Sequence, residues 1–417
     1  MNNDIYRNSR FFYVLEAAFE YFISILVTGA YLAKVTAYIG LPDSLTGVLT
    51  AFVSLGCGFQ IIAIFLANRQ PVKKWVSVLH IFNQLFFALI YLIPFFGLPK
   101  NLTVVLFCFF LLAGHIISNI VYSPKVNWLM SLVDDHKRGD FTATKEIVSL
   151  IGGIVFTFVV GQVIDRFEAA GSIETSLIFC GVGIFVLMLL HTATLLLSLE
   201  KPAVKKNTQI RDLLKDRGLF KVIFITVLWN VANYATTPFY GTYQTKELGF
   251  SMTFISILAA LYAICRSLVS KPLGRYADRT SFTRMLNICF VIQVFSFAVN
   301  VFTVPSNGKV FYTAYYILHA VAMAGINSGA INLIYDYVDH ERRVGALALQ
   351  STLAGFTGFF TTLIVSRLVD TIQANGNTFL GMNLYAQQVV SAIGVIVVLV
   401  ILVYLNTAFR GMKSKKE

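Results

Sequence analysis

NWLMSLVDDHKRGDFTATKEIVSLIGGIVFTFVVGQVIDRFEAAG, residues Asn127–Gly171, is matched by NLIYDYVDHERRVGALALQSTLAGFTGFFTTLIVSRLVDTIQANG, residues Asn332–Gly376. The two stretches align without a gap at a constant offset of 205 residues. In each, a membrane-length apolar run ends in an acid, an arginine follows four residues later, and a second apolar run leads to an acid and a glycine. The identical pairs include Asn127/Asn332, Val133/Val338, Asp134/Asp339, Arg138/Arg343, Gly153/Gly358, Thr157/Thr362, Asp165/Asp370 and Gly171/Gly376. A match of this length indicates two copies of one membrane unit.

The composition of the chain is that of a membrane protein. Of its 417 residues, 57% are hydrophobic and 13% are charged, and the mean hydropathy is +0.72. Soluble proteins of this size carry about 25% charged residues. The five cysteines all lie within apolar runs and form no CxxC pair, which predicts neither a disulfide framework nor a metal site. No P-loop, HExxH or GxSxG motif is found, so we expect a protein that is not an enzyme and that needs no cofactor.

Twelve apolar runs are long enough to cross a bilayer. They are predicted at Phe11–Tyr38, Leu45–Leu66, Trp75–Phe96, Thr103–Val133, Phe141–Ile164, Thr175–Leu197, Phe220–Gln244, Met252–Leu273, Met285–Val304, Val310–Val338, Gly345–Val369 and Leu384–Ala408. The longest polar stretch follows the sixth run. We therefore expect an N-terminal six-helix bundle over residues 1–199, a cytoplasmic loop over 200–218 and a C-terminal six-helix bundle over 219–417.

The basic residues are distributed unevenly between the two sets of connections. One set, which includes both termini, holds 24 of the 33 lysines and arginines, whereas the other holds four. Because basic residues stay in the cytoplasm, this predicts cytoplasmic termini, and we expect the protein in a bacterial inner (plasma) membrane. The net charge of +12 then reflects topology and contact with membrane lipids, so no nucleic-acid partner is expected.

A local motif adds a family resemblance to this architecture. The second half contains GRYADRTSFTR at Gly274–Arg284, and the first half contains ANRQPVKK at Ala67–Lys74, a degenerate copy without the glycine and the acid. The motif at Gly274–Arg284 is similar to the signature between the second and third helices of the major facilitator superfamily. The resemblance implies an all-α membrane protein with twelve transmembrane helices in two pseudo-symmetric six-helix bundles.

Charged residues at corresponding positions of the two halves are candidates for a cytoplasmic latch. A carboxylate between guanidinium groups binds them only when the helix ends are close. The resemblance implies that such a latch closes the cytoplasmic side in the outward-facing state. The candidate latch residues are Arg69, Asp134, Arg138, Asp278, Arg279, Asp339 and Arg343.

Glu16 and Glu20 lie one turn apart in the first span. An acid within the apolar layer is costly unless it faces a cavity, has a partner or takes up a proton. Glu16 lies near the cytoplasmic edge and could be an interfacial acid. Glu20 lies deeper, and it could carry a proton or bind a cationic substrate.

The resemblance implies that the first, fourth, seventh and tenth helices line a central path, and these spans carry polar residues. His115 and His319 stand one position apart in the repeat alignment and are further candidates for proton coupling, together with Glu146. Amide and aromatic groups suit hydroxyl-rich or zwitterionic solutes. The candidate substrate-binding residues are Asn119, Tyr122, Lys125, Trp229, Asn230, Asn233, Tyr234, Asn327 and Arg266.

These features predict secondary active transport of a small polar or anionic organic solute by alternating access. We expect coupling to protons, with sodium as the other candidate ion, and a monomeric protein. Two alternatives stay open at this point. One is proton-antiport efflux of lipophilic cations, and the other is a lipid flippase or a non-transporting sensor on the same fold.

Overall fold

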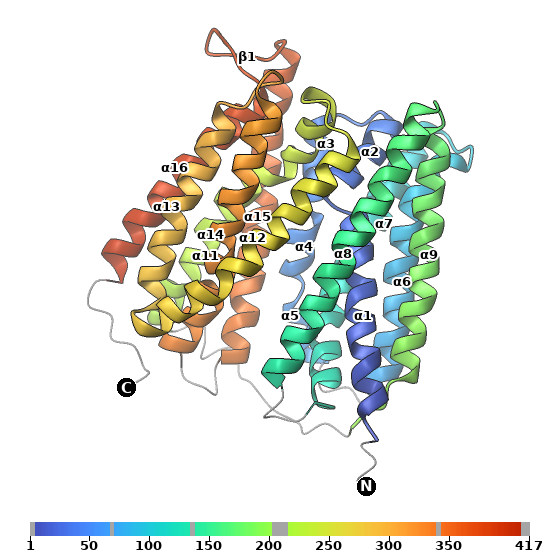
Figure 1. Ribbon diagram of the computed structural model, residues 1–417, viewed down its shortest axis with the longest axis vertical. Coiled ribbons are helices and arrows are strands. Elements are labelled where there is room, and N and C mark those ends of the chain that lie inside the picture. Colours follow the sequence, from blue (N-terminus) through green and yellow to red (C-terminus); the bar gives the residue numbers. More distant parts are fainter. Residues whose placement is uncertain (1–4, 67–70, 134–137, 202–215, 339–342, 410–417) are drawn as a thin grey trace. The chain divides into compact units, whose positions relative to one another are not determined.

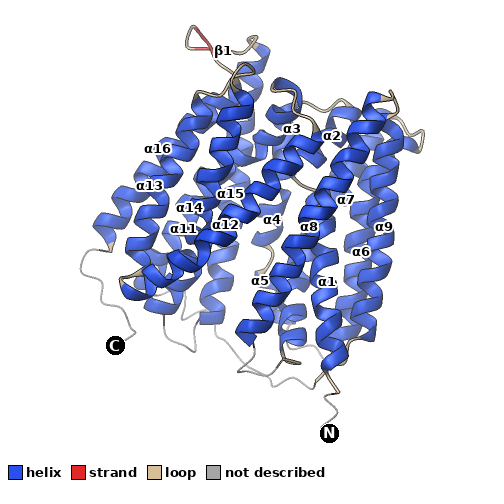
Figure 2. Ribbon diagram, viewed as in Figure 1, coloured by secondary structure: helices blue, strands red, loops and turns tan. Residues whose placement is uncertain are grey.

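The computed structural model describes residues 5–66, 71–133, 138–201, 216–338 and 343–409, and these are almost entirely helical (Figures 1 and 2). The chain divides into two compact units. The first comprises Met1–Leu41, Leu55–Lys206 and Ser251–Ser256, and the second comprises Pro42–Ser54, Asn207–Phe250 and Ile257–Glu417. Each unit therefore includes a short segment from the other half of the sequence.

The first unit is a bundle of long helices with apolar side chains between them. A buried group that includes Tyr13, Val76, Trp128 and Leu195 joins helices from distant parts of the sequence. The elements are α1 (Arg7–Leu26), α2 (Gly29–Ile39), the end of α4 (Phe52–Gly58), α5 (Ile61–Leu66), α6 (Val72–Leu92), the 3-10 turn Ile93–Phe95, α7 (Lys100–Met130), α8 (Arg138–Ala169) and α9 (Ile173–Leu197).

The second unit is likewise helical and has one small hairpin between its last two helices. The elements are α3 (Asp43–Thr50), α11 (Arg217–Thr242), a π-helical turn (Tyr243–Glu247), α12 (Met252–Arg279), α13 (Phe282–Val301), α14 (Gly308–Tyr337), α15 (Arg343–Ala374), β1 (Thr378–Phe379), β2 (Met382–Asn383) and α16 (Ala386–Ala408). Asp43 at the start of α3 pairs with Lys246 and accepts a hydrogen bond of 3.0 Å from Gln373.

Within the described chain, eleven helical stretches are long and apolar enough to cross a membrane, and α1 with α2 forms a further pair bent by 43°. If that pair is one span, the number agrees with the twelve runs of the sequence. The bend occurs because Val27 and Thr28 leave the helical conformation and Gly29 starts α2 with a φ of +55°. Glycine adopts this left-handed conformation without steric cost.

The second predicted span differs most from the expected continuous helix. It is divided into α3, α4 and α5, with breaks at Ala51 and at Phe59–Gln60. Gly56 of α4 lies so close to α7 that an added Cβ atom would be 2.7 Å from the carbonyl oxygen of His115. Gly56 therefore allows α4 and α7 to pack closely. The apolar pattern of the sequence does not indicate this contact.

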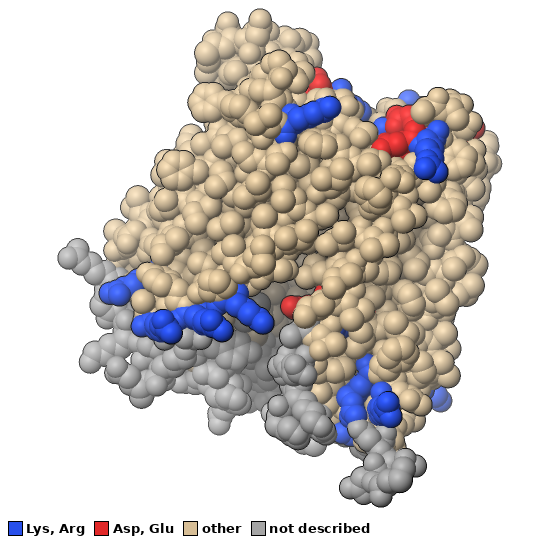
Figure 3. Space-filling view, viewed as in Figure 1, with Lys and Arg blue, Asp and Glu red and all other residues tan. Residues whose placement is uncertain are grey.

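Charged side chains are sparse over most of the visible surface (Figure 3). A row of lysine and arginine lies at the end of α12 and the start of α13, where Lys271, Arg275, Arg279 and Arg284 are all exposed. Uncharged residues cover most of the rest of the view, as expected for helices that face lipid.

Candidate functional site

Three charged side chains meet inside the first unit. Nζ of Lys125 on α7 lies 2.5 Å from Oε1 of Glu16 and 2.5 Å from Oε2 of Glu20, both on α1. The side chains of Glu16 and Lys125 are 2% and 1% exposed, whereas that of Glu20 is 27% exposed. We call Glu16, Glu20 and Lys125 the ionic cluster, and Glu20 is its route to the surface.

Helix geometry explains how the ionic cluster forms. A spacing of four residues places Glu16 and Glu20 on one face of α1, so one ammonium group on the facing helix can contact both carboxylates. A buried charge is tolerated when a partner compensates it. The sequence analysis singled out all three residues, but it placed Lys125 among the substrate-binding candidates and did not pair it with the acids.

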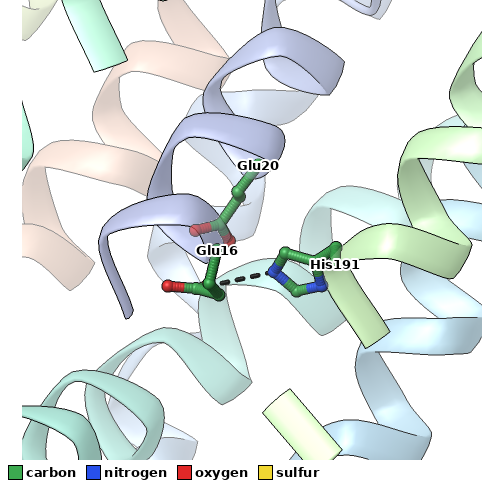
Figure 4. A group of neighbouring side chains, drawn as sticks. All are labelled: Glu16, Glu20 and His191. Carbon is green, nitrogen blue, oxygen red and sulfur yellow. Dashed lines mark hydrogen bonds and ion pairs between the residues drawn. The ribbon is translucent and has the colours of Figure 1, made fainter. Parts of the chain in front are cut away.

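His191 on α9 adds a histidine to the surroundings of the ionic cluster. Its Nε2 lies 3.1 Å from Oε1 of Glu16, and Figure 4 shows the ring directed at Glu16 across the space between two helices. The ring of His80 on α6 lies 4.9 Å from that of His191, measured between centroids. Both histidines are fully buried. Neither histidine was among the candidates from the sequence, because the two histidines considered there, His115 and His319, were chosen for their near-equivalent positions in the repeat.

The surroundings of the ionic cluster include a second lysine. Nζ of Lys145 on α8 lies 4.8 Å from the centroid of the Tyr13 ring, and Tyr13 precedes Glu16 by one turn of α1. Tyr122, one turn before Lys125 on α7, is 51% exposed, and Glu146 on α8 is also exposed. The candidates Tyr122 and Glu146 are thus accessible residues near the ionic cluster, and Lys145 is half-buried against Tyr13.

The other candidates of α7 serve packing in this structure. Asn119 donates a hydrogen bond of 2.9 Å to the carbonyl oxygen of His115 and accepts one of 3.3 Å from the thiol of Cys57. His115 is buried against Phe87 with 5.0 Å between ring centroids. Neither residue contacts the ionic cluster.

The second unit has a different polar centre, built around His319 on α14. Nδ1 of His319 lies 3.0 Å from Oε1 of Gln293, and the ring of Tyr315 stacks on the imidazole at 5.2 Å and 14°. Tyr262 of α12 lies 5.8 Å from the same imidazole. We call His319, Gln293, Tyr315 and Tyr262 the aromatic cluster. Arg266 follows Tyr262 by one turn of α12, is half-buried, and has no acidic partner among the described residues.

The remaining candidates of the second unit lie on α11 and α14. Trp229 is buried and packs on Phe290 at 5.8 Å, and Asn230 donates a hydrogen bond of 2.9 Å to the carbonyl oxygen of Thr226. Asn233 and Tyr234 are half-buried on α11, and Asn327 is exposed on α14. These amides and rings are not brought into the aromatic cluster by a described contact.

Most of the predicted latch falls outside the described part of the chain. Arg69, Asp134 and Asp339 lie in the gaps, and the side chains of Arg138, Asp278 and Arg343 are likewise not described. Only Arg279 is described among these candidates, and it is exposed at the end of α12.

The donor atoms of Glu16, Glu20 and His191 lie within 4.8 Å of one another, a spacing that a metal ion could use. The ammonium group of Lys125 already contacts both carboxylates, however. A metal ion would therefore have to displace a cation that is covalently part of the chain, and we do not assign a metal to this site.

Comparison with known proteins adds three findings. The family model described as Major Facilitator Superfamily matches residues 11–362 and 222–416. Similar solved structures include the nucleoside transporter NupG (TM-score 0.70, 16% identity, 99% of this chain and 100% of that chain covered) and a D-xylose-proton symporter (0.68, 14%, 94% and 96%). A bacterial homologue of the iron transporter ferroportin in an inward-facing state is also similar (0.69, 15%, 97% and 98%). No curated protein matches the chain. The matches confirm the fold class predicted from the sequence.

Proposed function

The chain belongs to the major facilitator superfamily, and from this premise we propose that it couples proton entry to the uptake of a small polar or anionic organic solute by alternating access. It is an integral membrane protein and a transporter of a small-molecule substrate, not an enzyme. The proposal adds the coupling ion, the class of solute, and an inner-membrane location with both termini in the cytoplasm.

The charge of the ionic cluster is the observation that supports proton coupling. With both carboxylates ionised and Lys125 protonated, the three side chains leave one excess negative charge. An uncompensated charge in the apolar layer is costly, and binding of one proton removes it. Glu20 is the member that reaches the surface, so it is the residue that receives the proton.

A proton suits this site better than a sodium ion or a metal cation. Proton binding needs a single carboxylate oxygen, whereas a metal ion needs several ligand atoms around it. Lys125 contacts one oxygen of each acid and would compete with any bound cation. The same contact weakens the alternative of a lipophilic cation bound by Glu20, because that cation would also have to displace the ammonium group.

The second unit supports an anionic or hydrogen-bonding solute. Arg266 lies half-buried in α12 beside the aromatic cluster, without an acidic partner in the described residues. An arginine within a membrane span is retained where it pairs with an anion or lines a cavity. We propose that Arg266 binds an acidic or strongly hydrogen-bonding group of the solute, and that Tyr262 offers a stacking surface.

Proton-driven accumulation in proteoliposomes tests this function. A thermal-shift screen with nucleosides, pentoses, organic acids and divalent metal salts first identifies a solute that stabilises the purified protein. Glu20→Gln is expected to abolish accumulation driven by a proton gradient while leaving exchange of labelled solute across the membrane. The matched control Glu168→Gln changes an exposed acid of α8 and is expected to keep both activities.

Three results would contradict the proposal. Accumulation by Glu20→Gln at the wild-type level would remove Glu20 from coupling. Loss of accumulation in Glu146→Gln alone would move the coupling site to α8. Accumulation that follows a sodium gradient and ignores the proton gradient would exclude protons as the driving ion.

A further inference from the structure

A group of buried polar atoms behind the ionic cluster has no hydrogen-bond partner among the described residues. They lie on α6 and α9, next to the ionic cluster. They are Oγ of Ser77, both ring nitrogens of His80, both polar side-chain atoms of Gln84, and Nδ1 of His191.

The spacing on α6 shows that these atoms share one helix face. Ser77, His80 and Gln84 follow at intervals of three and four residues, which places them in one row. His80 of this row stands 4.9 Å from His191 on α9. All four side chains are fully buried.

Buried polar groups in proteins almost always find a partner, either in the chain or in ordered water. A polar site with several donors and acceptors holds water, whereas an apolar void stays empty. Six unpartnered atoms on two adjoining helices therefore indicate internal water between α6 and α9. Imidazole is a side chain that can both accept and donate a proton.

We propose that His191 and His80, bridged by internal water between α6 and α9, store the coupling proton away from the ionic cluster. The inference rests on the proposed proton coupling and extends it, because Glu20 receives the proton and the histidines keep it. Glu16 connects the two, since its Oε1 contacts both Lys125 and His191.

The transfer is a simple exchange of protons. Lys125 links the two acids, and it takes the proton from Oε2 of Glu20 as it gives one of its own to Oε1 of Glu16. In the tautomer of His191 with hydrogen on Nδ1, Nε2 then accepts the proton from the protonated carboxyl of Glu16. The O–H bond of Glu16 breaks, an N–H bond forms, and the carboxylate and imidazolium remain 3.1 Å apart as an ion pair. The Nδ1 proton of His191 then passes to water and on to a ring nitrogen of His80, which restores neutral His191.

Several charged and titratable groups face this histidine pair from the packed helices. Helix α1 contributes Glu16 and Glu20, and α7 contributes Lys125, whereas Tyr13, Tyr122 and Lys145 lie further out around the ionic cluster. Lys125 opposes a second positive charge nearby, and the two acids favour it. The proton on the histidines is thus expected to depend on Glu16 remaining ionised.

Solid-state NMR of the full-length protein in liposomes, with ¹⁵N-labelled histidine, tests the storage site without a substrate. Between alkaline and acidic buffer, the signals lost in His191→Gln and His80→Gln are expected to change together from neutral to protonated shifts. Water-edited spectra are expected to show contact between water and both rings. Glu16→Gln is expected to disfavour the protonated form of both rings.

His115→Gln provides the matched control, because His115 is also a buried histidine of the first unit but does not contact the ionic cluster. The storage site is refuted if the His80 and His191 signals stay neutral throughout, if they titrate independently of Glu16, or if their rings are dry. Should His191→Gln not fold, the wild-type titration compared with His80→Gln decides the same question.

A transport measurement separates failure of this inference from failure of the proposed function. If the wild type shows no proton-driven accumulation, the proposed function fails. If the wild type and both histidine variants accumulate solute with the same pH profile, proton coupling stands and the storage site is refuted. The expected result is at least a tenfold loss of proton-driven accumulation in His191→Gln, with solute exchange retained.

Discussion

The two units of this transporter arise from one repeated sequence, yet their polar centres differ in kind. The first encloses the ionic cluster of Glu16, Glu20 and Lys125, and the second encloses the neutral aromatic cluster around His319. At the offset of the repeat, Lys125 corresponds to Ala330, so the second copy lacks the cation that compensates the acids. The duplication preserved the helices while the buried side chains took separate tasks.

The histidines of the two units also differ in their contacts. His115 and His319 are near-equivalent in the repeat, but His115 packs on Phe87 whereas His319 binds Gln293 and stacks on Tyr315. The first unit instead directs a different histidine, His191, at an acid. Position in the repeat therefore does not transfer a role from one unit to the other.

The largest expected effect comes from removing the cation of the ionic cluster. Lys125→Met leaves the buried carboxylate of Glu16 beside that of Glu20 without the ammonium group that compensates them, which costs about 3–5 kcal/mol when both remain charged. We expect the melting temperature in detergent to fall by roughly 10 °C at neutral pH. Lowering the pH protonates the acids, and this should recover part of the loss.

Two variants control for the loss of a long side chain. Lys145→Met removes a lysine that contacts Tyr13, and it is expected to cost much less. Glu16→Gln combined with Lys125→Met should be more stable than Lys125→Met alone. If Lys125→Met and Lys145→Met lowered the melting temperature equally, the loss would not come from the unpaired acids of the ionic cluster.

The second effect concerns the neutral centre of the other unit. Arg266→Gln is expected to raise KM for the solute about tenfold, which corresponds to about 1.4 kcal/mol. Thermal stability should stay near the wild-type value, because no acid is left unpaired. Uptake kinetics in proteoliposomes measure the change.

A conservative replacement sharpens the reading of Arg266. Arg266→Lys keeps the charge but loses the planar pair of donors, so partial recovery of KM would indicate recognition by charge. If KM stays unchanged in both variants, the guanidinium group does not contact the solute. The proposal that the second unit binds the solute through Arg266 would then be wrong.

Most of the architecture could be predicted, because the repeat and the membrane-length apolar runs are recognisable in the sequence alone. Glu16, Glu20 and Lys125 were also singled out one by one. Their pairing was not predictable, since Lys125 lies 105 residues from Glu20 and only the packing of α7 on α1 brings them together. His191 and His80 were missed for the same reason. The three-part second span was missed because a largely apolar run of membrane length predicts one continuous helix.

The cytoplasmic latch offers a case in which the two copies should behave alike. Asp134 and Asp339 occupy the same place in the repeat, although both lie outside the described residues. We expect Asp134→Asn and Asp339→Asn each to shift the conformational equilibrium about fivefold toward the inward-open state, or roughly 1 kcal/mol. Double electron–electron resonance distances between spin labels on the cytoplasmic ends measure the populations.

If Asp134→Asn and Asp339→Asn shift the conformational equilibrium by different amounts, the two units differ at their cytoplasmic ends as well as in their polar centres. Unchanged distances in both variants would count against the latch itself. Asp165→Asn is a useful comparison, because Asp165 accepts hydrogen bonds from the backbone of Met252 and Thr253 and thus acts at a helix start rather than in the latch.

The smallest effect is expected from an ion pair at the surface of the same unit that holds the ionic cluster. Lys34 and Glu168 lie 2.7 Å apart, as short as a charge-assisted bond requires, but their side chains are 16% and 47% exposed. Water already solvates such groups, so Glu168→Gln should cost at most about 1 kcal/mol, and less at high salt. Melting curves at low and high ionic strength measure both. If Glu168→Gln lowered the stability as much as Lys125→Met does, burial would not determine the cost of breaking an ion pair in this protein. The difference between the ionic cluster and the aromatic cluster would then need another physical explanation.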